Sequence, residues 1–436
     1  MSHSLPRDPA SCFARLRARN AELKAVSYVV PELRPSTNPD GPLGNVPFVF
    51  KDTWDVEGVP STGGSSRHAG RKPKRSSAAY DLFLEQGAVF LGKSNVGDMA
   101  FSSEATNYVF GATANPLDTA RTAGGSTGGG AAAVAAGLAA FDWGGDFGGS
   151  IRIPAAFCGV VGLRLSSRDW PLGGEHFPPM PGALLHMLGW GPITRTVREA
   201  RDLVDAARSL RRPEAPHRDF DLGDVVLLPP DAPTKGEWPT FAMDAAMALD
   251  RAGIHFSVGV AGMTPKGAER IFDRYLCARF DAFVNSGFMS TREAAARIAR
   301  GMLGRGSTSD RIHPTTGRLL AITALGHGLF FWDKRGTQEK VDELSRALSR
   351  VWNTGRLVLS PTTTFRAPLH GKSHMASGLL AFAKLGNVLD ATALSVPFGH
   401  FPGGMPRGLQ ILGPPGSERA VLDLAARLEA AESRTS

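Results

Sequence analysis

The alternation of apolar and polar segments predicts a protein that mixes strands and helices. Residues 46–50 are an apolar run of strand length, and a turn-forming segment, 38–41, leads into them. The pattern then indicates a helix over 77–86 and a second apolar strand over 88–91, with Gly87 ending the helix. A strand followed by a helix and another strand is typical of an α/β sheet.

Further along, the same pattern predicts more helices around this sheet. An N-terminal helix is expected within 10–30, an alanine-rich helix over 130–136 and an amphipathic helix over 197–210. An apolar strand is expected over 138–143, and the C-terminal helix begins after the capping residue Ser417. We therefore predict the α/β class, with a large mixed β-sheet flanked by helices on both faces.

The three cysteines, Cys12, Cys158 and Cys277, favour a reducing compartment. Their number is odd and no Cys-x-x-Cys pair occurs, so the sequence predicts neither a disulfide framework nor a zinc knuckle. The N-terminal segment is too polar for a signal peptide, and the longest apolar run, 131–141, is too short to span a membrane. We therefore expect a cytoplasmic protein without a membrane span.

The chain carries a formal net charge of +8, and its one dense basic run covers 67–75. Such a run could bind nucleic acid or an anionic membrane. It has neither interleaved aromatic residues nor helical spacing. We therefore interpret it as a solvated loop and expect no nucleic-acid partner.

Two glycine-rich segments, 122–130 and 146–154, hold the candidate chemistry. The first has no Gly-Lys-[Ser/Thr] sequence, which argues against a phosphate-binding P-loop. Residues 124–128 match the Gly-x-Ser-x-Gly pattern of α/β-hydrolases, but that motif needs a strand directly before its serine. Because 115–123 is polar and turn-like, we predict no strand there and disfavour an α/β-hydrolase site.

The second glycine-rich segment is better suited to holding an oxyanion. Glycine-permitted backbone angles would let residues 147–149 turn their N–H groups inward, next to a nucleophile at Ser150. A serine nucleophile needs a base, and no histidine lies near it in sequence. Lys51 ends the apolar strand and could serve if burial lowers its pKa. From the pattern alone, Lys51 could also be a surface lysine at a strand end.

Several motifs, in their order along the chain, resemble the amidase signature family. Ser126 and Ser150 stand 24 residues apart, which agrees with the family pattern. The match is dense over about 40–210 and resumes towards the C-terminus. The matching segments are 43–64, 92–95, 124–129, 146–163, 357–363, 394–399 and 408–413.

The resemblance implies hydrolysis of a carboxylic amide, with esters as a further substrate type, through an acyl-serine intermediate and without metal or cofactor. Ser150 then corresponds to the acylated nucleophile, Ser126 to a bridging serine on a cis peptide, and Lys51 to the base. The family pattern also includes oxyanion donors and a pair that braces their loop. These are the N–H groups of Phe147, Gly148, Gly149 and Ser150, and the side chains of Asp146 and Arg152.

The resemblance treats the chain as a single amidase domain, 1–436. Within it we expect a signature core over 40–210, a variable helical cap that forms the substrate region over 213–345, and a C-terminal part of the core over 346–436. The expected partner is a small amide molecule, and a homodimer is left open.

Some positions depart from the family pattern or suggest other chemistry. Thr127 replaces a more usual serine but keeps a hydroxyl, and Phe147 places a bulky ring beside the oxyanion donors. His370 and His374 have the spacing of a metal pair, but Gly371 weakens a helix there and no third ligand is evident. We therefore expect no metal site.

Two features of the sequence bear on the substrate. Residues 304–308 and 367–371 are similar to the branch of the family that hydrolyses fatty acid amides. Apolar side chains cluster over 177–190 and 330–332, so we predict a neutral, hydrophobic acyl or aryl amide, with plain core packing as the other interpretation. The clustered residues are Phe177, Met180, Leu184, Leu185, Met187, Leu188, Trp190, Phe330, Phe331 and Trp332.

Two rival functions stay open. The chain could be the glutaminase subunit of a tRNA-dependent amidotransferase, which should copurify with partner subunits and act weakly alone. It could also be a catalytically silent scaffold on the same fold, although the intact set of Lys51, Ser126 and Ser150 argues against this.

Overall fold

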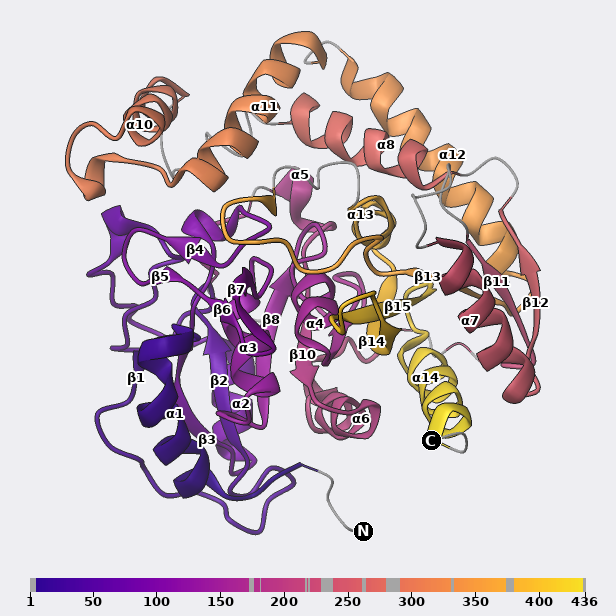
Figure 1. Ribbon diagram of the computed structural model, residues 1–436, viewed down its shortest axis with the longest axis horizontal. Helices are drawn as coiled ribbons and strands as arrows, with labels where there is room; N and C mark the ends of the chain where they lie inside the picture. The colour runs from indigo at the N-terminus through magenta and orange to yellow at the C-terminus, as the bar shows by residue number, and fades with distance from the viewer. Residues whose placement is uncertain are drawn as a thin grey trace.

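A mixed β-sheet of eleven strands dominates the described part of the computed structural model (Figure 1). The structure describes residues 5–171, 176–180, 182–215, 218, 220–228, 238–260, 264–279, 291–330, 333–373 and 380–433. The strands of this sheet are β1 (Val26–Val29), β2 (Pro47–Lys51), β3 (Val89–Ser94), β8 (Phe141–Asp146), β9 (Val161–Arg164), β10 (Gly189–Thr194), β11 (Asp224–Leu227), β12 (His255–Val258), β13 (Leu357–Pro361), β14 (Thr392–His400) and β15 (Pro406–Gly413).

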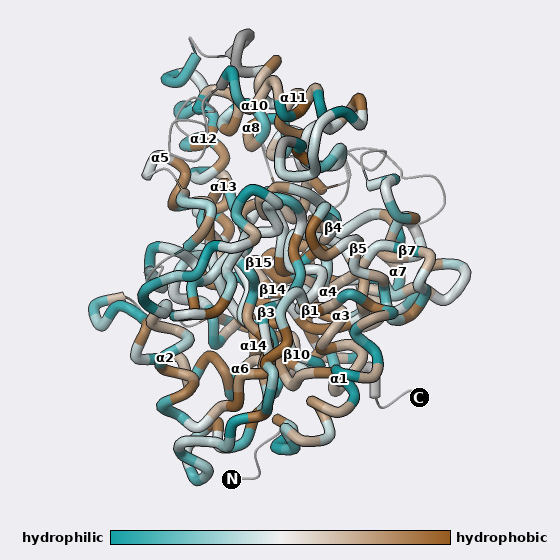
Figure 2. The backbone as a smooth tube through the Cα atoms, turned by 90° about the vertical axis from the view of Figure 1, so that its left-hand side faces the viewer, coloured by the Kyte–Doolittle hydropathy of each residue, from teal (hydrophilic) through white to brown (hydrophobic). Residues whose placement is uncertain are grey.

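The strand order is β1-β3-β2-β8-β10-β9-β14-β15-β13-β11-β12. Strands β3, β2 and β8 pair in parallel, as do β13, β11 and β12, while the strands between these two groups pair antiparallel. Hydrophobic stretches lie around the centre of the molecule, where β10 and β14 are labelled in Figure 2, and hydrophilic loops lie at its edges.

Helices cover both faces of the sheet. One face packs against α1 (Pro9–Leu23), α3 (Gly128–Ala135) and α4 (Arg152–Cys158). The opposite face packs against α2 (Ala78–Glu85), α6 (Val197–Ala206), α7 (Trp238–Arg251) and α14 (Glu418–Ser433). The predicted α/β class, a large mixed sheet with helices on both faces, is confirmed.

A further group of helices lies across the top of the sheet in Figure 1. It consists of α5 (Gly182–Leu185), α8 (Pro265–Ala278), α10 (Thr291–Leu303), α11 (Pro314–Phe330), α12 (Lys334–Trp352) and α13 (Ala381–Val388). The segment 213–345 thus contributes β11, α7 and β12 to the sheet and its flank before it forms α8, α10, α11 and the first part of α12, whereas α5 and α13 come from outside it. None of the helices in the described ranges is both long and apolar enough to cross a membrane.

Two short hairpins lie beside α3, and one of them corrects a prediction. Strand β4 (Thr106–Asn107) pairs with β5 (Gly111–Ala112), and β6 (Ala114–Asn115) pairs with β7 (Asp118–Thr122). The prediction that 115–123 contains no strand is therefore wrong. The hairpin forms its own two-stranded sheet apart from the central one, because its polar residues turn on themselves: Asn115 and Asp118 accept backbone N–H groups two residues ahead.

Two boundaries differ from the sequence pattern. The N-terminal helix ends at Leu23, because Lys24 takes a left-handed conformation with φ 49°, and β1 follows it. The strand expected over 138–143 begins at Phe141 and continues to Asp146. The shift matters for the site, because it adds Asp146 to a strand that already contains Asp142.

The alternation of side chains along β2 decides which way its last residue points. Phe48 and Phe50 face an aromatic cluster, in which Phe48 stacks on Phe141 with ring centroids 5.1 Å apart. Val49 faces the other side, towards α1 and α3. Because neighbouring strand residues point to opposite faces, Lys51 lies on the same face as Val49.

The basic run 67–75 contains two arginines that form ion pairs with carboxylates from other parts of the chain. Arg71 donates two hydrogen bonds to the buried carboxylate of Asp55, each 2.6 Å, and stacks over the ring of Phe177. Arg67 forms an ion pair with Glu293 of α10. The interpretation as a solvated loop is therefore wrong for Arg71, which is partly buried against Asp55, whereas Arg67 is exposed and its ion pair lies at the surface.

Candidate active site

Lys51 is buried at the end of β2, only 2% exposed. Its Nζ donates a hydrogen bond to Ser126 Oγ at 3.0 Å and one to the carbonyl of Gly145 at 2.6 Å. The interpretation of Lys51 as a surface lysine at a strand end is therefore excluded.

The electrostatic surroundings of Lys51 suit a base. Burial lowers the pKa of this lysine to about 7, although the nearby carboxylates of Asp142 and Asp146 act in the opposite direction. A substantial fraction of the lysine is then neutral at neutral pH, so it can accept a proton from Ser126.

Ser126 lies in a tightly packed turn after β7. The peptide bond between Gly125 and Ser126 is cis. Gly125 packs so closely on the backbone of Glu104 that an added Cβ would lie 2.7 Å from it. The Glu104 carboxylate accepts the N–H groups of Gly371 and Ser373, each at 2.9 Å, and so ties a C-terminal segment to this turn.

The loop that carries Ser150 follows β8 and is held by Asp146. The Asp146 carboxylate accepts the N–H groups of Gly149 at 2.8 Å and Ile151 at 3.1 Å. Gly149 has φ +102°, and a Cβ there would lie 2.5 Å from Ile153, so only glycine fits.

Arg152 locks the Asp146 carboxylate in place. Its guanidinium donates to both carboxylate oxygens, at 2.9 and 3.0 Å, and to the side chains of Asn387 and Gln410. Burial alone would raise the pKa of Asp146, but the charge of Arg152 holds that pKa well below its usual range. Asp146 therefore stays charged and keeps its hold on the loop, which is the bracing role implied by the resemblance.

These contacts change the set of oxyanion donors. The Gly149 N–H is already bonded to Asp146, so it is not free to hold an oxyanion. Within the described ranges, no hydrogen bond occupies the N–H groups of Phe147, Gly148 and Ser150. The predicted set of four donors therefore narrows to three.

Ser150 lies in the wall between two spaces of unequal size. The small space, about 30 Å³, is lined by Lys51, Ser126, Gly145 and His176 among others. The large cavity, about 600 Å³, is lined by α8 and α11 together with Gly148 and Phe147. An attacking Ser150 can therefore reach a substrate that extends into both.

The apolar residues predicted to face the substrate divide between these spaces and the core. Phe147, Met180 and Leu188 line the small space, whereas Phe177 packs against the ring of His68. Phe331 and Trp332 lie outside the described residues, as does the side chain of Phe330. Of the remaining residues, Leu184, Met187 and Trp190 are buried, and Leu185 is exposed.

The large cavity is mainly apolar but contains charges. Phe272 and Leu276 of α8 and Ile322 of α11 contribute to its apolar wall. Lys384 of α13 bridges Glu269 at 3.0 Å and Asp273 at 2.8 Å in the same cavity. A substrate there meets an apolar surface with a charged region at the helices.

Two residues of the site were missed by the sequence reasoning, Asp142 and His176. Asp142 lies between Phe141 and Trp143 near the start of β8, and an acidic residue between two aromatic residues of a strand is a usable signal of a buried carboxylate. His176 comes from a loop with no recognisable pattern, and a bridge between it and Trp54 brings it into the small space.

Asp142 lies next to Lys51 across the strand pairing. Val49 is in register with Asp142, Lys51 is in register with Ser94, and the Ser94 hydroxyl donates to Asp142 at 2.7 Å. The second carboxylate oxygen has no partner in the described ranges. Burial raises the pKa of Asp142, and the charge of Lys51 opposes that rise. The two side chains therefore form a coupled acid–base pair.

Replacing Asp142 with asparagine should move the acid limb of the kcat/KM profile to lower pH. The carboxylate raises the pKa of Lys51, so its loss leaves the lysine neutral at a lower pH. A shift of about one unit is expected from a neighbouring charge. The measurement is a pH–rate profile, with Asp250→Asn, at an exposed position of α7, as the matched control. If the acid limb of the profile does not move, or moves to higher pH, Asp142 does not raise the pKa of Lys51.

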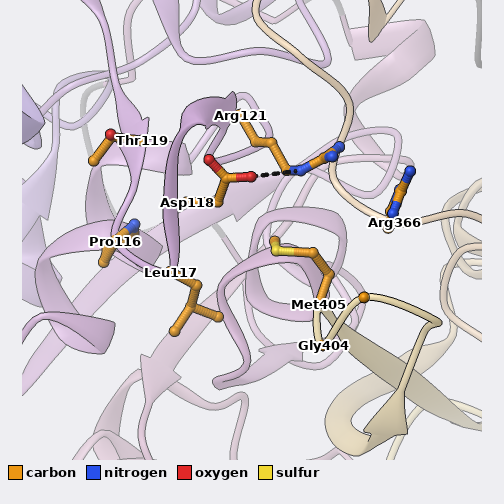
Figure 3. A pocket seen from close by; sticks show the side chains of 9 residues that line it. Pro116, Leu117, Asp118, Thr119, Arg121, Arg366, Gly404 and Met405 are labelled. Carbon is orange, nitrogen blue, oxygen red and sulfur yellow. Dashed lines mark hydrogen bonds and ion pairs between the residues drawn. The ribbon is translucent and has the colours of Figure 1, made fainter.

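A separate hollow of about 610 Å³ lies near the β6–β7 hairpin (Figure 3). Its lining includes Arg366 and the ion pair between Arg121 and Asp118 but neither of the two serines nor Lys51. Nearby, the ring of His370 lies against the carbonyl of Thr119. His374 of the histidine pair lies outside the described residues.

Known proteins similar to this chain include amidases and components of amidotransferases. A family model described as Amidase matches residues 7–219. One of the subunits of the glutamyl-tRNA(Gln) amidotransferase of Chloroflexus aggregans is 30% identical, over 94% of this chain and 90% of that protein. The structure of 6-aminohexanoate cyclic dimer hydrolase with substrate has a TM-score of 0.77 and 25% identity, covering 97% of this chain and 92% of the other. A bacterial aryl acylamidase of the amidase signature family shares the fold, with a TM-score of 0.76 and 23% identity over 97% and 92%.

Proposed function

This chain belongs to the amidase signature family, and on that premise we propose that it hydrolyses a carboxylic amide bond through an acyl-Ser150 intermediate. The observation that carries the proposal is the buried hydrogen bond from Lys51 Nζ to Ser126 Oγ, in a space that Ser150 also lines. A neutral lysine bonded to a serine hydroxyl can supply both the base and the acid that amide cleavage needs.

In acylation, neutral Lys51 accepts a proton from Ser126, which accepts one from Ser150. Ser150 Oγ attacks the carbonyl carbon while the N–H groups of Phe147 and Gly148, with its own, hold the oxyanion. The proton returns through Ser126 to the leaving nitrogen, because an amine leaves only after protonation. Water then attacks the acyl-enzyme with the same relay, which releases the acid and restores Ser150.

The large cavity supports an acyl group that is neutral and hydrophobic. Its volume of about 600 Å³ is within the range of small-molecule sites, and its walls are mainly apolar. Each methylene that enters such a wall is worth about 0.8 kcal/mol. We therefore expect kcat/KM to rise several-fold per added carbon until the cavity is full.

The test is a series of straight-chain primary amides from acetamide to decanamide, with ammonia release measured for each. A rising series followed by a plateau would support the proposed acyl specificity. A flat or falling series would refute the hydrophobic acyl group while leaving the Ser150 chemistry in place.

A second candidate is the glutaminase component of an amidotransferase. It is favoured by the similarity to the Chloroflexus protein and by the cluster of Glu269, Asp273 and Lys384, whose charges could hold an amino acid. Glutamine is the discriminating substrate in the same assay. Turnover of glutamine above every alkyl amide, together with copurifying subunits, would decide for this candidate.

The proposal also covers the compartment of the protein, the roles of the parts of the chain and the expected partner. Cys12, Cys158 and Cys277 are buried and form no disulfide among the described residues, which supports a reducing compartment such as the cytoplasm. We also propose that 40–210 with 346–436 supplies the catalytic core and that the helices within 213–345 shape the substrate cavity. A small amide is the proposed partner, and the intact relay speaks against a silent scaffold.

A further inference from the structure

The small space beside the relay limits what can leave from the tetrahedral intermediate. Its volume is about 30 Å³, against about 600 Å³ for the cavity on the other side of Ser150. A cavity with a volume of about 10–15 Å³ is just large enough to hold one water molecule. The small space therefore has room for ammonia or two to three waters, and its size favours ammonia over an aromatic amine as the group that leaves.

The position of the relay shows which end of the substrate enters the small space. The group that protonates the leaving nitrogen must lie within hydrogen-bond reach of it. Lys51 and Ser126 line the small space and are absent from the lining of the large cavity. Given the proposed function, on which this step rests, the leaving nitrogen points into the small space and the acyl group into the large one.

His176 supplies a hydrogen-bond acceptor in that space. Its Nδ1 lies 2.8 Å from the carbonyl oxygen of Pro178, which can only accept, so Nδ1 carries the proton and Nε2 has a lone pair. Nε2 makes no hydrogen bond within the described ranges. It is also not one of the fully buried polar atoms without a hydrogen-bond partner, so it is not completely enclosed by protein. His176 belongs to the lining of the small space, where Nε2 can meet a leaving nitrogen.

The ring of His176 is held in place and stays neutral. It packs edge-on against Trp54, with ring centroids 4.7 Å apart. Burial lowers the pKa of His176 to about 3, and the positive charges of Lys51, Lys93 and Arg71 act in the same direction. At working pH the imidazole can thus accept a hydrogen bond but cannot act as a general acid.

We propose that the small space is the leaving-group site for a primary amide, and that His176 Nε2 accepts one N–H of the leaving nitrogen. The C–N bond breaks as the Ser150 ester forms, and the relay delivers the Ser150 proton to nitrogen to give ammonia. His176 orients the nitrogen and takes no proton. Water then occupies the vacated space and releases the acid.

The first experiment varies the leaving group on one acyl chain, the best of the chain-length series. The substrates are the primary amide, the N-methylamide, the p-nitroanilide and the methyl ester. We expect kcat/KM for the primary amide to exceed that for the N-methylamide by about tenfold and that for the anilide by more, although p-nitroaniline is chemically the better leaving group. An anilide cleaved as fast as the primary amide would overturn the proposal.

The second experiment tests His176 with the His176→Phe and His176→Gln variants. The Phe variant removes the acceptor, whereas the Gln variant keeps an acceptor oxygen. For the primary amide, kcat/KM should fall about five- to tenfold in the Phe variant and recover in part in the Gln variant. For the methyl ester, which has no N–H to donate, it should not fall. His255→Phe, at an exposed position of β12 away from the site, is the matched control and should leave kcat/KM for both substrates unchanged.

The outcomes separate this inference from the proposed function. Because kcat/KM reports acylation, a fall confined to the amide identifies contact with the leaving nitrogen. An equal fall for amide and ester would overturn the role of His176 and leave the amidase assignment standing. If the Phe variant does not fold, the Gln variant provides the test. An equal fall in kcat/KM for the amide and the ester in that variant would also overturn the role of His176. Failure of the wild-type protein to cleave any of the four substrates would overturn the proposed function itself.

Discussion

Ser150→Ala should abolish amide turnover and covalent labelling by a fluorophosphonate, and it should leave the fold intact. Removal of the nucleophile from serine hydrolases costs about a million-fold in kcat. The loop itself should survive, because it is held by the bonds of Asp146 to Gly149, Ile151 and Arg152 rather than by the Ser150 hydroxyl.

Mass spectrometry of the labelled protein and an ammonia assay measure both effects. Ser103→Ala is the matched control, since it removes a hydroxyl that lines the same large cavity and leaves the relay in place. Retention of more than a few per cent of activity in the Ser150 variant would refute its role as the nucleophile. Absence of labelling in the wild-type protein would instead revive the silent scaffold.

Lys51→Met should cost amide hydrolysis about three orders of magnitude, within the range for loss of a general acid–base group. The variant keeps the apolar stem of the side chain but cannot relay a proton between Ser126 and the leaving nitrogen. An activated ester should lose less, because its leaving group departs without a proton. Equal losses of activity towards the amide and the ester would contradict the role of Lys51 as the acid that protonates the leaving nitrogen.

The wild-type pH profile provides a second test of Lys51. The base must be neutral, and burial lowers the pKa of Lys51 to about 7. Activity is therefore lost as pH falls below about 7 and reaches a plateau above it. The measurement is kcat/KM for the amide from about pH 5 to 10, with Lys72→Met, which alters an exposed lysine, as the control. A profile that is flat through pH 7 would show that this lysine does not titrate in the reaction.

Part of the site could be predicted because its residues lie in short segments with strong local requirements. Gly149 needs a left-handed backbone angle, and Asp146 binds N–H groups three and five residues ahead, so a short segment was enough for the resemblance to the family motif to identify the loop. The pattern placed Lys51 at the end of the apolar strand, and the resemblance to the family gave it the role of the base. Such constraints operate within a few residues and remain visible in one sequence.

Other features depended on contacts between distant segments. Whether the Gly149 N–H was free could not be seen until the Asp146 carboxylate was placed, and the sequence reasoning counted one oxyanion donor too many. The hairpin of β6 and β7 was missed because its residues are polar. The pairing of two arginines in the basic run required Asp55 and Glu293, of which the latter lies more than 200 residues away.

The sequence by itself determined the α/β class, because the periods of strands and helices leave local patterns, and its motifs resembled one family, which pointed to Lys51, Ser126 and Ser150 as the proposed site residues. Only the tertiary structure decided that Asp142 lies beside Lys51 and that His176 enters the small space. Strand register sets the first, and the packing of a loop against Trp54 sets the second. Both depend on which distant segments become neighbours, and no spacing along the chain encodes this. The same reason explains why the size of the two spaces around Ser150, and with it the proposed leaving group, could be read only from the folded chain.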